Sequence, residues 1–360
     1  MLAFTVLLIS SYWIFMFLSI KGWRKALEHK GVVDKVQNHL SLDVLIPYRN
    51  EERHLKRLLH DIQSQSSDLA GVRFIFIDDH SEDMSFDIIE KAKSEMDLLS
   101  LKCVGNGKKA ALNEALDHVR TKHVLFWDAD ISIGAEYFSA MRNTPQGDLT
   151  ILPVIPLEQK GIWASYAALD FLSLIGMTFS WAALQRPIMA NGANLLVANQ
   201  AVYLDPKTAS GDDVQTLHRI KERGGVVCFD LDERLTVKTH MPEDFKAFFH
   251  QRMRWAAKSS RYSDKDTLLM GWFILVFQMF LLTGLSYFII QGYMKMALAL
   301  FLLKSSADFL FLHLVTKHFS VQNPMRFFII ASLFNLVMTP IVFIASRLFS
   351  FEWKERKYRS

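Results

Sequence analysis

The 360-residue sequence contains little cysteine, with only Cys103 and Cys228. The two lie far apart along the chain and neither belongs to a CxxC pair. This pattern excludes a disulfide scaffold and argues against a structural zinc site. We therefore expect two reduced, buried thiols, as is common in a cytosolic domain.

The chain also lacks an excess of charge. Its 41 Lys and Arg residues against 37 Asp and Glu give a formal charge of +4. No basic cluster interleaved with aromatic residues stands out in the polar part, so we expect no nucleic-acid partner. The GxxxxGK[ST] spacing of a P-loop is missing, and there is no internal repeat. The weakly basic balance suits an anionic membrane surface instead.

Long apolar runs are abundant and segregated. Leu2–Ile20 carries no charge and is long enough to span a bilayer. It lacks the basic start and cleavage site of a signal peptide, and Lys21, Arg24 and Lys25 come directly after it. Residues 1–25 are thus a predicted membrane anchor, and the positive-inside rule places the next part of the chain in the cytoplasm.

Further apolar stretches lie in a predicted membrane region, residues 267–350. They are Leu268–Ile290, Met294–Val315 and Phe327–Phe349. Lys304 and Asp308 share one helical face of the middle stretch, and we interpret them as a local ion pair.

The predicted topology contains a conflict. If all four apolar segments span, the basic tail 351–360 ends outside, against the positive-inside rule. One segment is therefore expected to be re-entrant or interfacial, and the middle one is the first candidate. The expected location is a bacterial inner membrane, crossed several times, with a cytoplasmic catalytic domain.

Residues 41–242 have the rhythm of an α/β domain. Leu42–Ile46, Phe74–Ile77 and Val124–Phe126 are predicted strands, and helical patterns alternate with them. Asn50 is the predicted N-cap of the first helix. This order predicts right-handed crossovers and a mostly parallel, Rossmann-like sheet.

Residues 243–262 predict an amphipathic helix. Its apolar face holds Phe245, Phe248, Phe249, Met253 and Ala256. Gln251, Arg254 and Lys258 share the polar face, while Arg252 falls on the apolar side. The pattern favours a helix in the membrane interface over a plain core-facing helix.

Acidic residues come directly after the predicted strands. Asp78 and Asp79 stand after the second strand, and Asp128 and Asp130 after the third. Asp is common in turns, so each pair alone is weak evidence. Because ligands bind at the carboxyl ends of strands in open α/β sheets, the two pairs should converge on one crevice.

Three local motifs suggest chemistry for that crevice. Asp128-Ala129-Asp130 could hold Mg²⁺ or Mn²⁺, with one carboxylate on the metal and the other on ribose or metal. Gly107-Lys108-Lys109 opens a helix and favours phosphate. Asp212-Asp213 could supply a general base or merely cap the helix Val214–Ile220.

Several motifs together resemble family 2 glycosyltransferases, the inverting group with the GT-A fold. The resemblance runs from Leu42 to about Ser260. Its motifs are VLIPYRNEE (44–52), IDDHSED (77–83), GKKAAL (107–112), DAD (128–130), NGAN (191–194), GDD (211–213) and QRMRW (251–255).

The resemblance implies roles for the nucleotide-sugar site. Asp78 and Asp79 look like the acids that contact the nucleobase. Pro47, Arg49 and Glu51 would frame the base and ribose. Asp128 resembles the acid beside the sugar and diphosphate, with Lys108 near it. Asp130 resembles the ligand of a divalent metal, Mg²⁺ or Mn²⁺.

The resemblance also implies a catalytic set. Asp213 matches the catalytic base, and Asp212 stands where many relatives have Glu. Gln251 and Arg254 match the motif that closes over the diphosphate. Trp255 and Asn194 would contact the acceptor. An arginine can stabilise a departing diphosphate, and a tryptophan offers a flat face for a sugar.

The expected function is inverting transfer from a nucleotide-diphosphate-sugar to a membrane-associated, lipid-linked acceptor. The runner-up is a polysaccharide synthase that extends a glycan at the membrane. A binding subunit without activity is disfavoured because every proposed acid is present. A nucleotidyltransferase is disfavoured because it has no use for residues 251–255.

Overall fold

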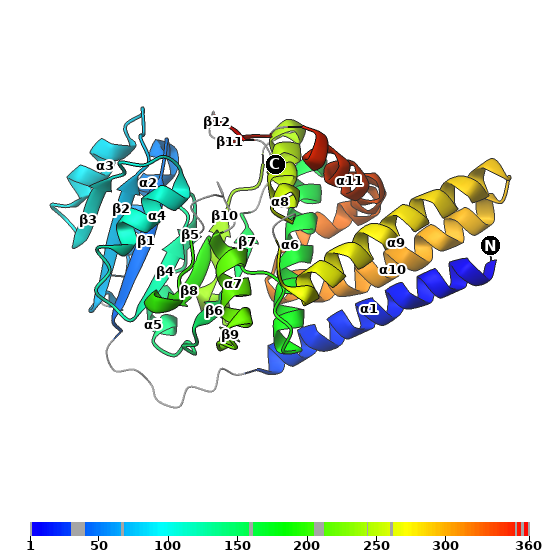
Figure 1. The fold of residues 1–360 in the computed structure, drawn as a ribbon, viewed down its shortest axis with the longest axis horizontal. Helices are drawn as coiled ribbons and strands as arrows, with labels where there is room; N and C mark the ends of the chain where they lie inside the picture. Colours follow the sequence, from blue (N-terminus) through cyan, green and yellow to red (C-terminus); the bar gives the residue numbers. More distant parts are fainter. Residues whose placement is uncertain are drawn as a thin grey trace. The chain divides into compact units, whose positions relative to one another are not determined.

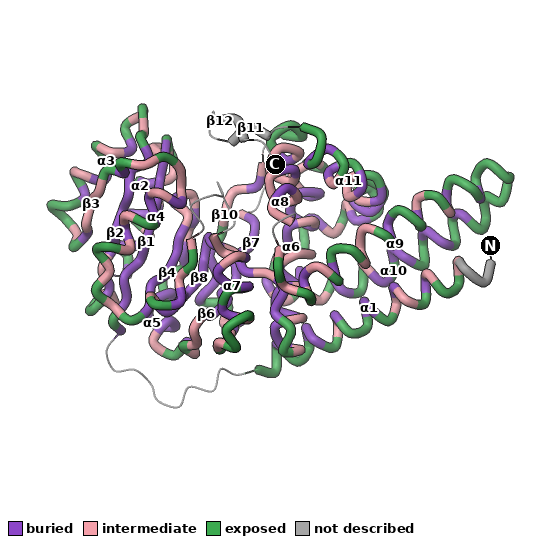
Figure 2. Tube along the Cα trace, viewed as in Figure 1, coloured by how far each residue is buried: buried purple, intermediate pink, exposed green. Residues whose placement is uncertain are grey.

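The computed structural model describes residues 2–29, 40–65, 68–157, 161–204, 212–242, 244–259, 262–349, 351–353 and 356–358. The chain forms two compact units, which Figures 1 and 2 label by element and by burial. The sheet unit comprises Leu27–Leu157 and Pro187–His240. The helical unit comprises Met1–Ala26, Glu158–Arg186 and Met241–Ser360.

A seven-stranded sheet is the centre of the sheet unit, as far as the described residues show. Its order is β3 (Leu98–Lys102), β2 (Val72–Asp78), β1 (Leu42–Tyr48), β4 (His123–Trp127), β8 (Asn194–Ala198), β6 (Leu149–Ile151) and β9 (Val227–Phe229). The first four strands are parallel, as predicted. β8 runs antiparallel to both β4 and β6, so the sheet is mixed.

Helices cover the sheet because its central strands are apolar on both faces. Every residue of β1 is buried, and Figure 2 shows this strand in purple. The helices of this unit are α2 (Glu52–Gln63), α3 (Ser85–Ala92), α4 (Lys108–Leu116), α5 (Tyr137–Met141) and α7 (Asp212–Glu222). On α2 the predicted apolar face is buried: Leu55, Leu58, Leu59 and Ile62.

The predicted N-cap of α2 is wrong. Glu51 occupies that position and makes no capping bond. Asn50 instead adopts a positive φ of 53°. Its side-chain Oδ1 accepts a hydrogen bond of 2.8 Å from the Glu82 N–H, so Asn50 ties together two loops. Asn tolerates this left-handed conformation better than most residues do.

A small three-stranded sheet completes the unit. It consists of β5 (Ser132–Ile133), β10 (Val237–Thr239) and β7 (Val154–Pro156). β10 pairs antiparallel with β5 and parallel with β7. β10 thereby holds in place the short strand β5, which comes shortly after Asp130. Two short 3₁₀ turns also lie here, η2 (Asn199–Ala201) and η3 (Glu233–Leu235).

The helical unit contains the predicted apolar segments. Its elements are α1 (Leu2–Glu28), α6 (Ile162–Ala183), α8 (Phe245–Lys258), α9 (Lys265–Ile290), α10 (Met294–His318), η5 (Asn323–Phe327), α11 (Phe328–Leu348) and the tail strands β11 (Phe351–Trp353) and β12 (Arg356–Tyr358). Among the residues that the structure describes, five helices are long and apolar enough to cross a membrane: α1, α6, α9, α10 and the helix at 323–348.

One of these helices, α6, is an addition to the predicted set. Its residues fall inside the predicted domain 41–242, whereas in the structure they pack with the helical unit. The remaining four candidates coincide with the predicted apolar segments. Lys304 and Asp308 form the predicted ion pair, with Nζ 2.6 Å from Oδ2, and the Tyr12 hydroxyl donates to Asp308.

Candidate functional site

The loops after β1 and β2 form one braced corner of the sheet unit. The Asp79 N–H donates to the Tyr48 carbonyl at 2.8 Å. The Arg49 Nη1 donates to the Asp79 carbonyl at 3.2 Å, and Arg49 is nearly buried. His80 has a positive φ of 61°, which turns the chain sharply after Asp79. These bonds fix the backbone that the sequence assigns to the nucleobase.

The two acids at this corner are positioned differently. Asp79 Oδ1 accepts a hydrogen bond of 2.9 Å from the Gly107 N–H, which joins it to the start of α4. Asp78 Oδ1 accepts from the Ser81 N–H at 3.0 Å and caps its own turn. Gly107 has a φ of 92°, a conformation that favours glycine. The carboxylate of Asp79 is thus coupled to the predicted phosphate loop.

Lys108 is the centre of the acidic crevice. Its Nζ lies 2.6 Å from Asp128 Oδ1 and 3.8 Å from Asp212 Oδ2. Burial by itself would lower the pKa of the Lys108 ammonium, but the charges of Asp128 and Asp212 outweigh this and raise it well above its usual value. A permanently charged cation therefore connects the end of β4 with the start of α7.

Asp213 lies beside Lys108 at the N-terminus of α7. Its Oδ2 accepts from the Gly192 N–H at 3.2 Å, and its Oδ1 accepts from the Val214 N–H at 2.8 Å. A side chain at position 192 would crowd this group, because an added Cβ would lie 3.3 Å from Asp212 Oδ2 and 3.6 Å from Lys108 Nζ. A larger residue at this position would therefore require the Asp212 carboxylate to shift slightly.

Asp130 is the second acid of the DAD motif. The Thr239 hydroxyl donates to its Oδ2 at 3.5 Å. Within the described residues, no group of three or more His, Cys, Asp or Glu side chains could hold a metal by itself. A Mg²⁺ ion in a nucleotide site commonly takes one or two carboxylates, and phosphate and water supply the rest. The half-buried Asp130 fits that kind of site.

Glu51 forms an ion pair near the same corner, with Oε2 2.6 Å from the His54 Nδ1. The hydrogen bond that the His54 ring donates to Glu51 raises the pKa of His54, and burial opposes this rise. Pro47 lies buried within β1, opposite Ile77 of β2. Any contribution of Pro47 to the ribose site therefore passes through the backbone.

Asn194 does not fit its predicted acceptor role. It is fully buried in β8. Its amide nitrogen donates to the carbonyls of Pro153 and Leu235, both at 2.9 Å. Its oxygen accepts from the Tyr137 hydroxyl at 2.5 Å and from the Trp127 indole at 3.4 Å. This amide is satisfied inside the protein, so we withdraw Asn194 from the acceptor site.

Gln251, Arg254 and Trp255 lie on α8 and belong to the helical unit. All are partly exposed. Arg252, the residue that broke the predicted apolar face, makes an ion pair with Asp170 of α6. Its guanidinium also lies 4.2 Å from the ring centroid of Trp255. The irregularity in the sequence pattern is therefore a contact between two helices.

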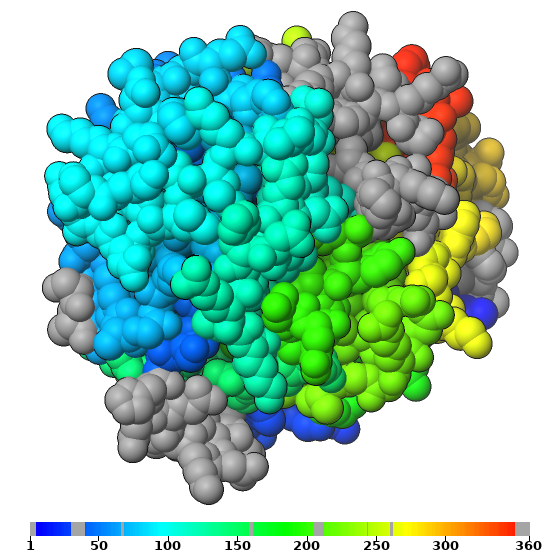
Figure 3. Space-filling model, turned by 60° about the vertical axis from the view of Figure 1, so that its left-hand side comes forward, coloured from blue at the N-terminus to red at the C-terminus, as the bar shows by residue number. Residues whose placement is uncertain are grey.

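Gly107, Gly192 and Asp212 belong to the predicted motifs but were given no role of their own in the predicted site. The glycines donate backbone N–H groups to Asp79 and Asp213, and Asp212 shares Lys108 with Asp128. The signal in the sequence for these backbone contacts was a glycine within or directly beside each motif. Segments far apart in the sequence meet here, and Figure 3 shows the corresponding cyan and green surfaces adjoining one another.

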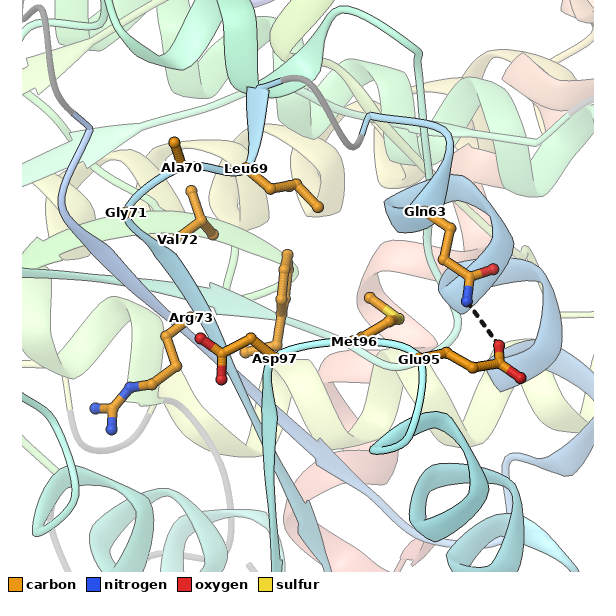
Figure 4. A pocket seen from close by; sticks show the side chains of 10 residues that line it. Gln63, Leu69, Ala70, Gly71, Val72, Arg73, Glu95, Met96 and Asp97 are labelled. Carbon is orange, nitrogen blue, oxygen red and sulfur yellow. Dashed lines mark hydrogen bonds between the residues drawn. The ribbon is translucent and has the colours of Figure 1, made fainter.

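A separate pocket lies at the opposite end of the strands, where β2 begins (Figure 4). Its lining residues are Gln63, Leu69, Ala70, Gly71, Val72, Arg73, Phe74, Glu95, Met96 and Asp97. The seven residues of β2 extend over roughly 20 Å at the usual strand rise. The pocket is therefore distinct from the crevice around Lys108.

Known proteins with a similar fold were found. The mannosyltransferase PcManGT from Pyrobaculum calidifontis, in complex with GDP-Man and Mn²⁺, is 16% identical with a TM-score of 0.59, covering 95% of this chain and 98% of that one. S. aureus TarS 1-349, in complex with UDP-GlcNAc, is 14% identical with a TM-score of 0.43, covering 89% and 97%. The first likeness confirms the expected GT-A fold class.

A relative was also found by sequence, the poly(ribitol-phosphate) beta-glucosyltransferase of Bacillus spizizenii. It is 24% identical over 129 residues, which cover 34% of this chain and 20% of that protein. The chain thus matches about a fifth of this relative's length.

Two family models match the chain. "Glycosyl transferase family 2" matches residues 43–147, and "Glycosyl transferase family group 2" matches residues 123–345. Their ranges include the corner around Asp79, the Lys108 crevice and the motif on α8. Since the second model matches more than half of the sequence, the chain belongs to the family 2 glycosyltransferases and is a glycosyltransferase enzyme.

Proposed function

We propose that this enzyme transfers a sugar from a nucleotide-diphosphate-sugar to a membrane-associated, lipid-linked acceptor, with inversion at the anomeric carbon. The observation that carries the proposal is the crevice in which Lys108 joins Asp128 to the acidic start of α7. Positive and negative groups alternate there at the ends of the strands, where α/β sheets bind ligands.

The donor's nucleoside would bind at the corner made by the first two loops. Asp78 and Asp79 accept hydrogen bonds from a nucleobase, and Arg49 and Glu51 frame the ribose. Lys108 lies next along the crevice and can exchange its contact with Asp128 for a phosphate oxygen. The exchange replaces one charge-assisted hydrogen bond by another, so it costs little.

A divalent cation held by Asp130 would supply counter-charge to the diphosphate as the glycosidic bond breaks. The protein itself positions the two acids of the DAD motif. Asp130 is held by Thr239 on β10, and Asp128 is oriented by Lys108. Arg254 of α8 adds a second positive charge for the departing diphosphate.

Asp213 is the proposed general base. Its two oxygens accept backbone N–H bonds from Gly192 and Val214, which aim the carboxylate without neutralising it. It would take the proton from an acceptor hydroxyl as that oxygen attacks the anomeric carbon. Trp255 would offer its ring to the acceptor sugar or lipid headgroup.

The membrane-associated acceptor is inferred from the position of the motif in the chain. α8 carries Gln251, Arg254 and Trp255 and is followed directly by the apolar helices α9 and α10. An acceptor embedded in the bilayer surface would meet this motif without leaving the membrane. We infer a multi-pass protein of the bacterial inner membrane whose sheet unit is cytoplasmic.

The proposal is tested by donor hydrolysis with detergent-purified protein across a panel of nucleotide-sugars, with Mn²⁺, with Mg²⁺ and with chelator. We expect metal-dependent release of one nucleoside diphosphate, lost in Asp130→Ala. Isothermal titration of the same nucleotides separates failure to bind from failure to react. Absence of both binding and release from every donor would refute the proposal.

A second candidate is transfer to a glycan polymer. It is favoured by the similarity to an enzyme named for a poly(ribitol-phosphate) acceptor. Incubation with a lipid-linked acceptor and excess donor distinguishes the two functions. A single added sugar supports the lipid acceptor, whereas a ladder of products supports polymer extension.

A further inference from the structure

The two ends of α6 lie on the same side of any membrane. β6 precedes α6 in the chain and β8 comes after it, yet these strands pair directly, with Ile151 opposite Leu195. A helix that crossed the bilayer would leave its flanking strands on opposite faces, where they could not pair. The sheet therefore excludes α6 as a span, although its length and composition would permit one.

The helices α1, α9 and α10 pack on one another, and α6 contacts this bundle through Trp181, whose indole donates to Ser19 Oγ of α1. Tyr12 of α1 stacks on Phe277 of α9 at 4.2 Å, and the Trp13 indole donates to the Leu303 carbonyl of α10. A short turn that includes Gly292 joins α9 to α10, so the two return antiparallel. Figure 1 shows the three helices extending side by side. They have the arrangement of membrane spans.

α11 packs on α9, where the Gln278 Nε2 donates to the Asn335 carbonyl at 3.0 Å, and also on α8 and α6. Ala345 forms a buried cluster with Met253 and Ala257 of α8. Further along, the Arg347 Nη2 donates to Ser259 Oγ at 3.2 Å, just after α8 ends. Near its other end, Phe334 lies 5.9 Å from Trp163 of α6, between ring centroids. α11 thus accompanies α8 and α6, and Figure 1 shows the three together.

The partner α8 cannot enter hydrocarbon. It has 14 residues, too few to span, and it carries several cationic side chains. Among them are Lys246, Arg254 and Lys258. Since α11 lies along this helix, a transmembrane position for α11 would draw those charges toward the bilayer centre, which is costly. Both helices are accommodated if they lie flat at the interface.

α11 also presents an apolar stripe away from its partners. The exposed side chains recur every three or four residues: Ile330, Leu333, Val337, Ile341 and Ile344. This spacing places them on one helical face. An interfacial helix buries such a face in the boundary between headgroups and acyl chains. The occupant that this stripe fits is the lipid surface itself.

We propose that α6, α8 and α11 form a platform that binds the lipid surface on the side of the sheet unit, and that only α1, α9 and α10 span. The proposal rests on the membrane location inferred under the proposed function. It places the basic tail on the same side as the sheet unit, which satisfies the positive-inside rule. In this proposal the apolar segment that does not cross the membrane is α11. The sequence pattern had suggested the middle segment, α10, instead.

The test maps cysteines in the full chain in a Cys103→Ser, Cys228→Ser background. Single cysteines are placed at the exposed positions Lys91, Gln185, Gln291 and Gln322, and at Ser360 in the tail. A membrane-impermeant maleimide is added to intact spheroplasts and, separately, to opened membranes. We expect Q291C to be labelled in intact cells and K91C, Q185C, Q322C and S360C only after opening.

Each alternative gives a different pattern. Labelling of S360C together with Q291C would mean that α11 spans, and labelling of Q322C with Q291C would mean that α10 does not. Either result overturns the proposal, as does labelling of Q185C with Q291C. Carbonate extraction of the same membranes provides the control. Release of the whole chain by carbonate would refute the membrane location itself, which separates that failure from a wrong topology.

Discussion

At the scale of single residues, Lys108 connects two parts of the site. It joins the DAD motif to the acids of α7. We expect Lys108→Met to lower kcat/KM for the donor by about 100-fold, the usual cost of one lost electrostatic contact in an active site. Lys108→Arg, which keeps the charge, should lose less. Steady-state kinetics with donor titration checks this, and an unchanged donor affinity in Lys108→Met would contradict it.

Asp212 and Asp213 form a matched pair for assigning the base. Asp213→Asn should lower kcat by roughly 10² to 10⁴-fold and leave donor binding intact, because a positioned base contributes about that much. Asp212→Asn should mainly weaken donor binding, since Asp212 contacts Lys108. Calorimetry and turnover rates distinguish the two effects. If the kcat loss falls on Asp212→Asn instead, the roles are reversed.

His54 gives the sheet unit a pH-dependent contact with Glu51. The hydrogen bond that the His54 ring donates to Glu51 raises the pKa of His54, burial opposes this rise, and the charges of Glu51 and Asp130 add to it. The contact therefore stabilises the fold below the ordinary His pKa of about 6.5 and is lost as pH rises through the higher folded value.

We expect Glu51→Gln to lower the free energy of unfolding by about 1 kcal/mol at pH 5.5 and by less at pH 8.5. The effect is small because His54 is partly exposed. Thermal unfolding of both proteins across this pH range measures the difference. A difference that does not change with pH would show that the imidazolium is not involved.

At the scale of elements, the ion pair between Arg252 and Asp170 attaches α8 to α6. Both side chains are largely buried, so removing one charge leaves the other without a partner. We expect Asp170→Asn or Arg252→Met to destabilise the helical unit by about 3–5 kcal/mol. Thermal unfolding in detergent measures the loss.

The double variant Arg252→Met, Asp170→Leu is the control for that pair. Because it removes both charges, it should recover most of the lost stability. If the double variant is as unstable as the single ones, packing and not charge is responsible. Arg252 also lies over Trp255, so acceptor KM should rise in Arg252→Met even where the protein remains folded.

At the scale of the whole molecule, the proposed reaction is a single displacement. In the proposed scheme Asp213 accepts the proton of the acceptor hydroxyl, and no covalent sugar intermediate forms. We expect the product to carry the anomeric configuration opposite to that of the donor. Proton NMR of the anomeric signal during early turnover checks this, and retained configuration would refute the mechanism.

The predicted strands and apolar segments could be found from the sequence because their signals are local. Short apolar runs indicate β1, β2 and β4, and long ones indicate the helices α1, α9, α10 and α11. The acids of the site could be found because they stand directly after strands. Motif order along the chain then indicated the family.

Other features depended on partners far away in the chain, which no local pattern reveals. Asn194 looked like a site residue, but four buried groups around β8 satisfy its amide. Arg252 looked misplaced on its helix until Asp170, 82 positions earlier, proved to be its partner.

The amino-acid sequence by itself determined the chemistry of this protein: a nucleotide-sugar crevice with paired acids, a basic phosphate loop and apolar anchors. Residues that are close together in the sequence encode these features, so the features can be recognised without knowledge of the fold. The tertiary structure decided how the segments are used. Pairing of β6 with β8 argues against α6 as a span, and packing on α8 is the basis for the proposed interfacial position of α11. Hydropathy measures only the preference of a segment for an apolar environment, and lipid and protein both provide one.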